Sequence, residues 1–191
     1  MGRPSDVQLV FITRKTVGGA CFAAALLLCG IQPSRAVDGL AVVAGEGRHS
    51  DMLRIGAQWQ WSGRWLQGEH AHLGGFWDLG VARWRRETAP GQSDSLTEIS
   101  LTPVFRVQAN GLRGAYLEGG IGVHLLSATS LGNKRYSTAF QFGEHLGFGY
   151  RFGARGALDL GYRYQHISNA DIKIPNSGAD FHQVRLQYWF R

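Results

Sequence analysis

The sequence lacks three features that characterise large groups of proteins. It has only two cysteines, Cys21 and Cys29, and both precede residue 37, so no disulfide can hold the later part of the chain together. No stretch after Ala36 is apolar for 18 residues, which argues against a transmembrane helix. The net charge of +6 at pH 7 is spread along the chain without a long basic run. The sequence therefore has no nucleic-acid-binding pattern, and we expect no nucleic-acid partner.

Residues 1–36 have the pattern of a cleaved signal peptide. A basic stretch that ends at Lys15 precedes an apolar run over residues 17–28, and the small residue Ala36 suits a signal-peptidase site. We therefore expect export and cleavage after Ala36. The remaining residues, 37–191, are enough for one domain.

Alternation of apolar and polar residues dominates this domain. From Ala115 to Leu125 every odd position is apolar or Gly, whereas the even positions include Tyr116, Glu118 and His124. A period of two is typical of β-strands with two different faces. The pattern predicts eight strands, with approximate cores at residues 39–47, 51–61, 69–84, 96–108, 114–127, 138–151, 156–168 and 180–190.

The two faces of these strands favour a membrane barrel over a secreted β-sandwich. One face is apolar and the other carries Gly, Gln, Arg, His and Glu, and strands of about 10 residues can cross a bilayer at a tilt. Aromatic residues lie near strand ends, as in the belts at membrane surfaces: Trp59, Trp61, Trp65, Trp84, Tyr150, Tyr188 and Trp189. In lipid the sheet must close to pair its backbone groups. We predict an all-β, eight-stranded antiparallel transmembrane β-barrel of the Gram-negative outer membrane, with a packed polar interior.

The connections differ between the two ends of this barrel. The turn at residues 152–156 is short and is expected to face the periplasm. The stretches 87–95, 129–137 and 169–179 are longer, and we expect them to be extracellular loops. Lys134, Arg135 and Lys173 in these loops could attract lipid phosphates, although solvated loop charge explains them as well.

Four polar residues have the phase of the lipid-facing side: Glu144, His166, Ser168 and Asp180. A charged residue on that face costs about 2–4 kcal/mol near the midplane of the bilayer. Residues two apart on a strand share a face, so His166 and Ser168 point the same way, and Asp180 begins the next strand in the same phase. A hydroxyl beside an imidazole that a carboxylate orients is the arrangement of a serine hydrolase. The alternative is that these residues begin the headgroup zone, where polarity is tolerated.

The motif HISNA at residues 166–170, followed by PNSG at residues 175–178, resembles the signature of the outer-membrane lipid A 3-O-deacylases, the PagL family. The resemblance implies an eight-stranded barrel that hydrolyses the ester-linked 3-hydroxyacyl chain at position 3 of lipid A in the outer leaflet. It implies no cofactor.

The resemblance also implies roles for individual residues. Ser168 resembles the nucleophile and His166 the general base, while Asn169 and Asn176 resemble the loop amides that support the oxyanion. The third member departs from the family, which usually has Glu where this chain has Asp180, one methylene shorter.

Glu144 is a rival for the third member, because strand pairing across the turn at residues 152–156 would bring it beside His166. Two other functions also stay open: a different lipid A-modifying barrel such as a palmitoyltransferase, and a non-enzymatic structural or adhesive barrel. No spacing of metal-ligating residues is diagnostic, so we expect no metal site. The expected partners are lipid A or lipopolysaccharide as substrate and the lipids of the outer membrane; a homodimer stays open.

Overall fold

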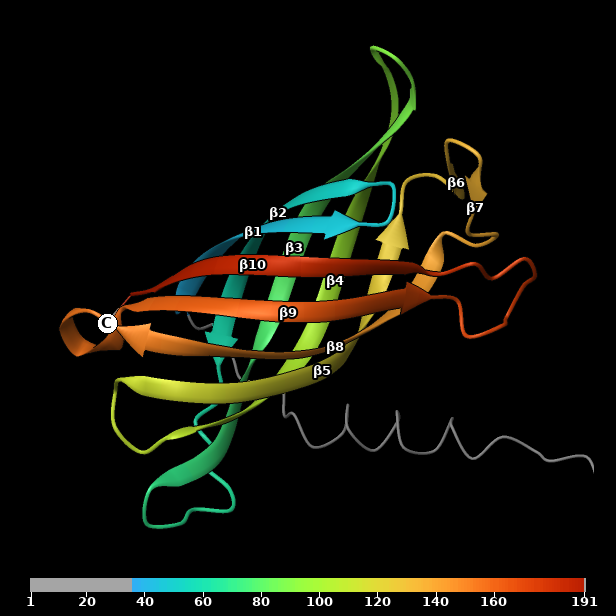
Figure 1. Ribbon diagram of the computed structural model, residues 1–191. Helices are drawn as coiled ribbons and strands as arrows, with labels where there is room; N and C mark the ends of the chain where they lie inside the picture. The colour runs from blue at the N-terminus through green and yellow to red at the C-terminus, as the bar shows by residue number, and fades with distance from the viewer. Residues whose placement is uncertain (1–35, 191) are drawn as a thin grey trace, which may run out of the picture. The chain divides into compact units, whose positions relative to one another are not determined.

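The computed structural model describes residues 36–190, so the expected signal peptide lies outside the described residues. Eight antiparallel strands close into a barrel in the order β1-β10-β9-β8-β5-β4-β3-β2 (Figure 1), which confirms the predicted fold class. They are β1 (Gly39–Gly47), β2 (Asp51–Gln60), β3 (Ala71–Ala89), β4 (Gln92–Ala109), β5 (Gly114–Leu126), β8 (Phe140–Phe152), β9 (Leu158–Ser168) and β10 (Ala179–Trp189).

The connections between these strands contain three short elements. The β5–β8 connection carries a small two-stranded sheet, β6 (Ser130–Leu131) with β7 (Lys134–Arg135), and the β8–β9 turn carries a 3₁₀ helix, η1 (Ala154–Gly156). Among residues 36–190 no helix is long and apolar enough to cross a membrane.

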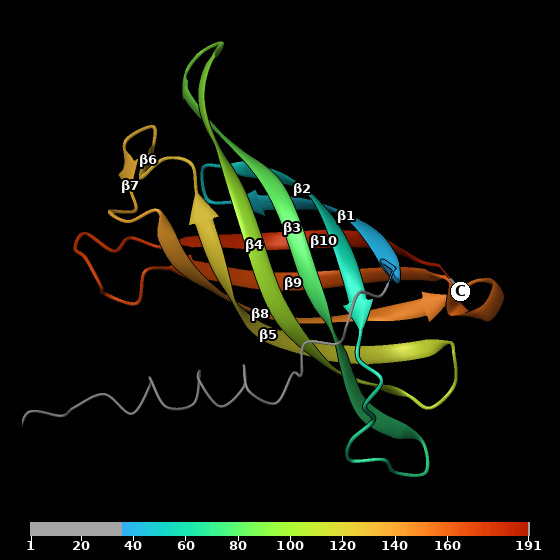
Figure 2. The same ribbon diagram turned by 180° about the vertical axis from the view of Figure 1, so that it is seen from behind.

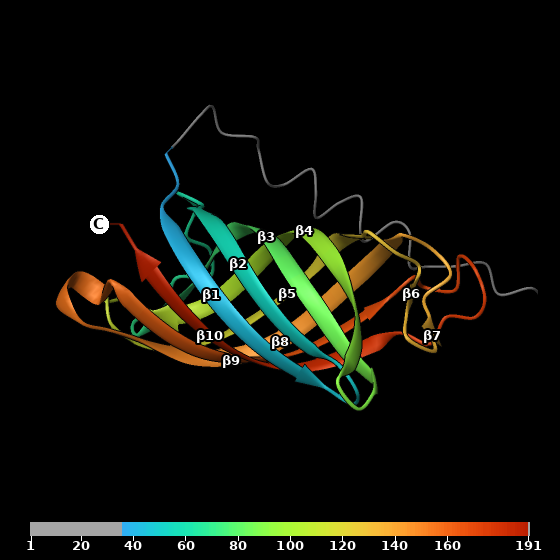
Figure 3. The same ribbon diagram turned by 90° about the horizontal axis from the view of Figure 1, so that it is seen from above.

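Strands β8, β9 and β10 lie side by side on one wall of the barrel, and β3 and β4 lie on the opposite wall, as the view from behind shows (Figure 2). Strands β1 and β2 continue the sheet beyond β10 (Figure 3). The β1–β2, β3–β4, β5–β8 and β9–β10 connections lie at the same end of the barrel, which we call the predicted extracellular end. The C-terminus lies at the other end (Figure 1).

Strands β3 and β4 are longer than predicted. The prediction of a loop at residues 87–95 is wrong, because β3 runs to Ala89 and β4 begins at Gln92. The chain turns at Pro90 and Gly91, and Gly91 has a φ of 75°, which a residue without a side chain adopts most readily. This hairpin projects beyond the rest of the barrel (Figure 1), where it needs no apolar face, so the alternation that marks the other strands is absent.

The interior of the barrel is polar, as predicted, and it contains a network of paired charges. Glu118 lies within 2.8 Å of Arg106, 2.5 Å of Arg163 and 3.0 Å of Arg185. Arg106 also lies 2.7 Å from Asp159. Because every one of these buried charges has an opposite partner, the network can be accommodated away from water.

An apolar cluster closes the predicted extracellular end from inside. It contains Val43, Met52, Ala82, Trp84, Leu96, Leu126, Leu131, Tyr136, Ile167, Ala179 and Phe181. The prediction that Trp84 and Trp189 belong to the membrane-surface belt is wrong, since both are 0% exposed. Trp84 packs against Phe181 inside the barrel, at 4.8 Å between ring centroids. Ile167 and Phe181 belong to this cluster and anchor the end of β9 and the start of β10. The cluster therefore supports the outer surface of these two strand ends.

Candidate active site

His166 and Ser168 lie on the outward face at the end of β9, and Asp180 lies on the outward face at the start of β10. The register of the two strands pairs Asp180 with His166 and Ala179 with Ile167. Ile167 is fully buried, so the strand alternation turns the residues on either side of it toward the outer surface. The pairing brings residues 14 positions apart in the sequence next to each other.

His166 and Asp180 form a direct hydrogen bond. The Nδ1 atom of His166 lies 2.7 Å from Oδ1 of Asp180. Since a carboxylate accepts and does not donate, Nδ1 carries the proton, and the Nε2 atom of a neutral imidazole is then left as an acceptor. The hydroxyl of Tyr164 donates to the same carboxylate oxygen at 3.0 Å. The carboxylate is thus held by two donors, and its partner imidazole has one nitrogen available for chemistry.

Ser168 shares the face of His166 but is not hydrogen-bonded to it. The Cα atoms of residues two apart on a strand are separated by about 6.6 Å. Within residues 36–190 the Ser168 hydroxyl makes no hydrogen bond. The structure therefore joins His166 to Asp180 and leaves the Ser168 hydroxyl on the same surface, free to react or to bind.

Glu144 lies on the other side of His166. The β8–β9 register pairs it directly with His166, so the imidazole is flanked by a carboxylate on each neighbouring strand. Glu144 is exposed, and it makes no hydrogen bond or ion pair with any residue in the described part of the chain. Within the described residues, Asp180 is the carboxylate that hydrogen-bonds to the imidazole.

Asn169, directly after Ser168, is fully buried and ties the following loop to the barrel. Its side-chain amide donates to the backbone oxygens of Tyr136 at 3.0 Å and Lys173 at 2.7 Å. Its backbone N–H donates to Oδ1 of Asn176 at 3.0 Å. Both protons of the Asn169 carboxamide are thus engaged, which differs from the expectation that this amide supports an oxyanion.

Other donors lie in the same loop. The Asn176 amide donates to Oδ1 of Asp171 at 3.1 Å, which uses one of its two protons. Ala170 and Asp171 adopt positive φ values of 50° and 61°, which are uncommon for residues other than Gly. Within residues 36–190 their backbone N–H groups make no hydrogen bond. Consecutive strained residues of this kind often occur at functional sites.

Gly178 closes the loop against the imidazole. A Cβ atom at this position would lie 2.8 Å from Cε1 and 3.2 Å from Nε2 of His166, and the residue has a φ of 52°. We expect Gly178→Ala to displace the imidazole and to lower any reaction rate that depends on Nε2 by at least about tenfold, because positions held to within about 0.5 Å matter in catalysis. The check is a rate measurement against Gly111→Ala, where the nearest atom to a Cβ lies 3.7 Å away. Equal rates in the two variants would contradict this prediction.

Sequence reasoning did not find the Tyr164–Asp180 hydrogen bond or the contact between Gly178 and the His166 ring. Tyr164 precedes His166 by two residues, and this spacing already indicates that the two side chains share a face. The position of Gly178 depends on the conformation of the β9–β10 loop and had no such signal. Among the residues that the structure describes, no group of three or more His, Cys, Asp or Glu side chains is arranged to hold a metal ion.

The part of the chain that resembles known proteins includes these site residues. The family model described as "Lipid A 3-O-deacylase (PagL)" matches residues 51–189. The lipid A deacylase PagL of Pseudomonas aeruginosa is 32% identical over 162 residues, which are 84% of this chain and 91% of that protein. The lipid A deacylase PagL of Bordetella bronchiseptica is 37% identical over 115 residues, which are 59% of this chain and 61% of that protein. The crystal structure of the outer membrane enzyme PagL matches with a TM-score of 0.71 at 26% identity, over 80% of this chain and 99% of that one.

Proposed function

Since this chain belongs to the lipid A 3-O-deacylase (PagL) family, we propose that it hydrolyses lipid A at position 3 through a serine nucleophile, Ser168. The protein is an outer-membrane β-barrel, like the enzyme whose crystal structure it matches. The substrate is lipid A, and the reaction is the hydrolysis of its ester-linked 3-hydroxyacyl chain.

The hydrogen bond of 2.7 Å between His166 and Asp180 on the outer wall carries this proposal. The ester of lipid A lies in the membrane beside the barrel, so groups that attack it must face outward and not into the interior. A polar pair on the lipid face costs free energy of folding, so its presence there favours a functional role. The Ser168 hydroxyl, free on the same face, supplies the nucleophile that such a pair would activate.

The proposed reaction uses these three side chains as follows. His166 Nε2 takes the proton of Ser168 as the serine oxygen attacks the ester carbonyl, and Asp180 stabilises the imidazolium that forms. The bond to the sugar oxygen then breaks, and the imidazolium gives its proton to that oxygen as it leaves. Water attacks the acyl-enzyme in the same way and releases a 3-hydroxy fatty acid and the free serine.

The oxyanion needs preorganised donors close to Ser168. The second amide proton of Asn176 and the backbone N–H groups of Ala170 and Asp171 have no partner within residues 36–190 and suit this purpose. Asn169, whose amide protons are engaged, acts instead as a positioning residue that fixes the loop carrying these donors.

Expression in a Gram-negative bacterium that has no lipid A deacylase tests the activity. Mass spectrometry of the extracted lipid A should show the loss of one 3-hydroxyacyl chain relative to cells with the empty vector. A gain of one palmitoyl chain would indicate a palmitoyltransferase, and an unchanged mass would indicate a structural or adhesive barrel. Either of these two results contradicts the proposal.

A further inference from the structure

A groove of about 590 Å³ opens at the predicted extracellular end, next to the candidate site. Its walls come from the β1–β2 turn, the outer part of β3, the β6–β7 region and the β9–β10 loop, and Asp180 forms part of its edge. The volume lies within the range of about 300–1,000 Å³ that is typical of small-molecule sites. The carboxylate that orients His166 thus also borders a cavity outside the lipid-facing wall.

This groove is strongly cationic. Arg48, Arg86, Lys134 and Arg135 line it, and Asp180 is the one acidic residue among its lining residues. None of the four cations forms an ion pair with a residue in the described range 36–190. Four cations without an ion-pair partner in the described range, facing one acid, favour an anionic ligand.

Arg86 and Arg48 are close enough to Lys134 to repel its positive charge. Burial lowers the pKa of Lys134, and the positive charges of Arg86 and Arg48 lower it further, while Asp180 opposes the shift. A bound anion would relieve this repulsion.

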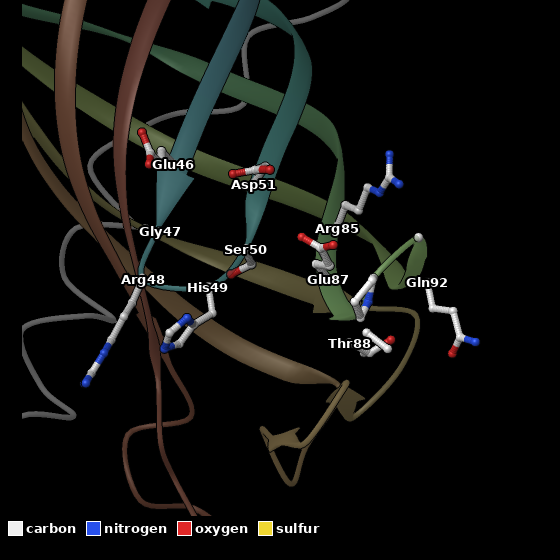
Figure 4. Close-up of a pocket in the computed structure, with 13 residues that line it drawn as sticks. Glu46, Gly47, Arg48, His49, Ser50, Asp51, Arg85, Glu87, Thr88 and Gln92 are labelled. Carbon is white, nitrogen blue, oxygen red and sulfur yellow. The ribbon is translucent and has the colours of Figure 1, made fainter.

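A neighbouring pocket provides a contrast. It is bordered on one side by the same β1–β2 turn and on the other by the β3–β4 hairpin, and the carboxylates of Glu46, Asp51 and Glu87 lie among its lining residues (Figure 4). Arg48, which lines both cavities, and Arg85 are the two cations of this second pocket, and with three acids beside them it has no excess of positive charge. The cationic character therefore belongs to the groove beside Asp180 and not to this whole end of the barrel.

Hydrogen bonds hold two walls of the groove in place. Ser177 donates to the backbone oxygen of Arg135 at 2.9 Å, and Ser137 donates to the backbone oxygen of Pro175 at 2.7 Å. The β6–β7 region is thereby tied to the β9–β10 loop, which also carries the proposed oxyanion donors. The position of Lys134 and Arg135 relative to the loop that follows Ser168 is thus constrained by the fold.

We propose that this cationic groove binds a phosphate monoester on the sugar of lipid A while the ester lies at Ser168. This inference rests on the proposed function, because it assumes that the substrate is a phosphorylated glycolipid. Arg and Lys side chains form strong charge-assisted hydrogen bonds with phosphate oxygens. The phosphate would position the sugar, and the acyl chain would lie along the apolar wall below His166.

Kinetics on purified barrel in zwitterionic detergent micelles test the proposal. The substrates are bisphosphorylated lipid A and the same lipid after removal of the phosphate at position 1, at position 4′ or at both. We expect the loss of the bound phosphate to raise KM by about tenfold, the effect of one strong charge-assisted contact, with kcat nearly unchanged. The double variant Arg86→Gln/Arg135→Gln should have a similarly high KM for all substrates. Arg85→Gln, next to Arg86 on β3 but facing the other pocket, is the matched control and should keep the preference.

Equal KM values for all four substrates in the parent protein would overturn the proposal, and this comparison does not depend on the folding of any variant. An equal loss of preference in Arg85→Gln would also overturn it, since general surface charge would then explain the effect. Inorganic phosphate distinguishes the source of the anion. If free phosphate is the ligand of the groove, it should change the rate with bisphosphorylated lipid A as much as with the dephosphorylated lipid, and that result would contradict binding of the lipid phosphate. An effect confined to the dephosphorylated lipid, or no effect, supports the proposal. Activity of Ser168→Ala would remove the serine mechanism without altering the KM comparison, so the two proposals can fail separately.

Discussion

Replacement of Ser168 by Ala should abolish the release of the 3-hydroxyacyl chain while the barrel still folds. In serine hydrolases the loss of the nucleophile or of its base costs on the order of 10³–10⁶-fold in rate. His166→Ala should be equally severe, and the double variant should be no worse than either single one, because the two residues act as a unit. Mass spectrometry of lipid A from cells that express each variant measures the effect.

The fold should survive the Ser168 substitution because the hydroxyl makes no hydrogen bond within residues 36–190. A folded barrel can be distinguished from an unfolded chain by its electrophoretic mobility in detergent before and after heating. Ser130→Ala provides the control, since Ser130 is a serine at the same end of the barrel but lies in β6, away from His166. Full deacylation by the Ser168→Ala variant would rule out the serine mechanism.

The barrel was predictable because the lipid bilayer imposes a strict period of two on each strand. The prediction failed where the bilayer no longer acts, as in the hairpin around Pro90 and Gly91, whose strands are wet on both faces. It also fails at Trp84 and Trp189, which follow the phase of their strands and not the preference of Trp for the membrane surface. Trp84 is offset by an odd number of residues from outward Val81, and Trp189 follows outward Tyr188, so alternation alone would have directed both inward.

The candidate site was only partly predictable, for a similar reason. Strand phase alone indicates that His166, Ser168 and Asp180 share the outer face. Which carboxylate bonds to His166 depends on register and side-chain reach, and the sequence alone left Asp180 and Glu144 both open. The use of the Asn169 amide depends on a contact with the backbone of Tyr136, 33 residues away in a separate loop. Contacts between loops follow no periodicity, so a resemblance to known motifs was the only guide there.

The cationic groove is even less predictable from sequence, because it is formed by residues from several separate segments. The sequence identifies Lys134 and Arg135 as loop cations that could attract phosphate, but Lys173, which has the same sequence pattern, does not line the groove. Arg48 comes from the β1–β2 turn and Arg86 from the outer part of β3, and only the closure of the barrel brings them to the same cavity. The order of the strands therefore decides which charged residues share a cavity, and the sequence pattern of each loop does not reveal it.

The second large loss of activity is expected on substitution of Asp180. It shows which of the two carboxylates that flank His166 takes part in the reaction. Asp180→Asn keeps the shape of the side chain but removes the charge that stabilises the imidazolium, and the corresponding change in a serine protease lowers kcat by about 10⁴-fold. We expect a loss of about 10²–10⁴-fold in the rate of deacylation. Glu144→Gln should leave the rate close to that of the parent, because Glu144 makes no hydrogen bond or ion pair with a described residue. Initial rates of purified variants on bisphosphorylated lipid A provide the measurement.

Asp180→Glu adds a control for length, since it keeps the charge and restores the side chain that the family usually carries. The pairing of Asp180 with His166 across the strands lets the shorter side chain reach Nδ1, and the Tyr164 hydroxyl holds the same oxygen from the other side. The longer side chain would have to bend to make the same contact, so we expect Asp180→Glu to be slower than the parent but faster than Asp180→Asn. An inactive Glu144→Gln together with an active Asp180→Asn would instead make Glu144 the residue that orients His166. In that case the Asp180–His166 hydrogen bond would serve the structure of the outer wall, and the reaction would rely on the carboxylate of β8.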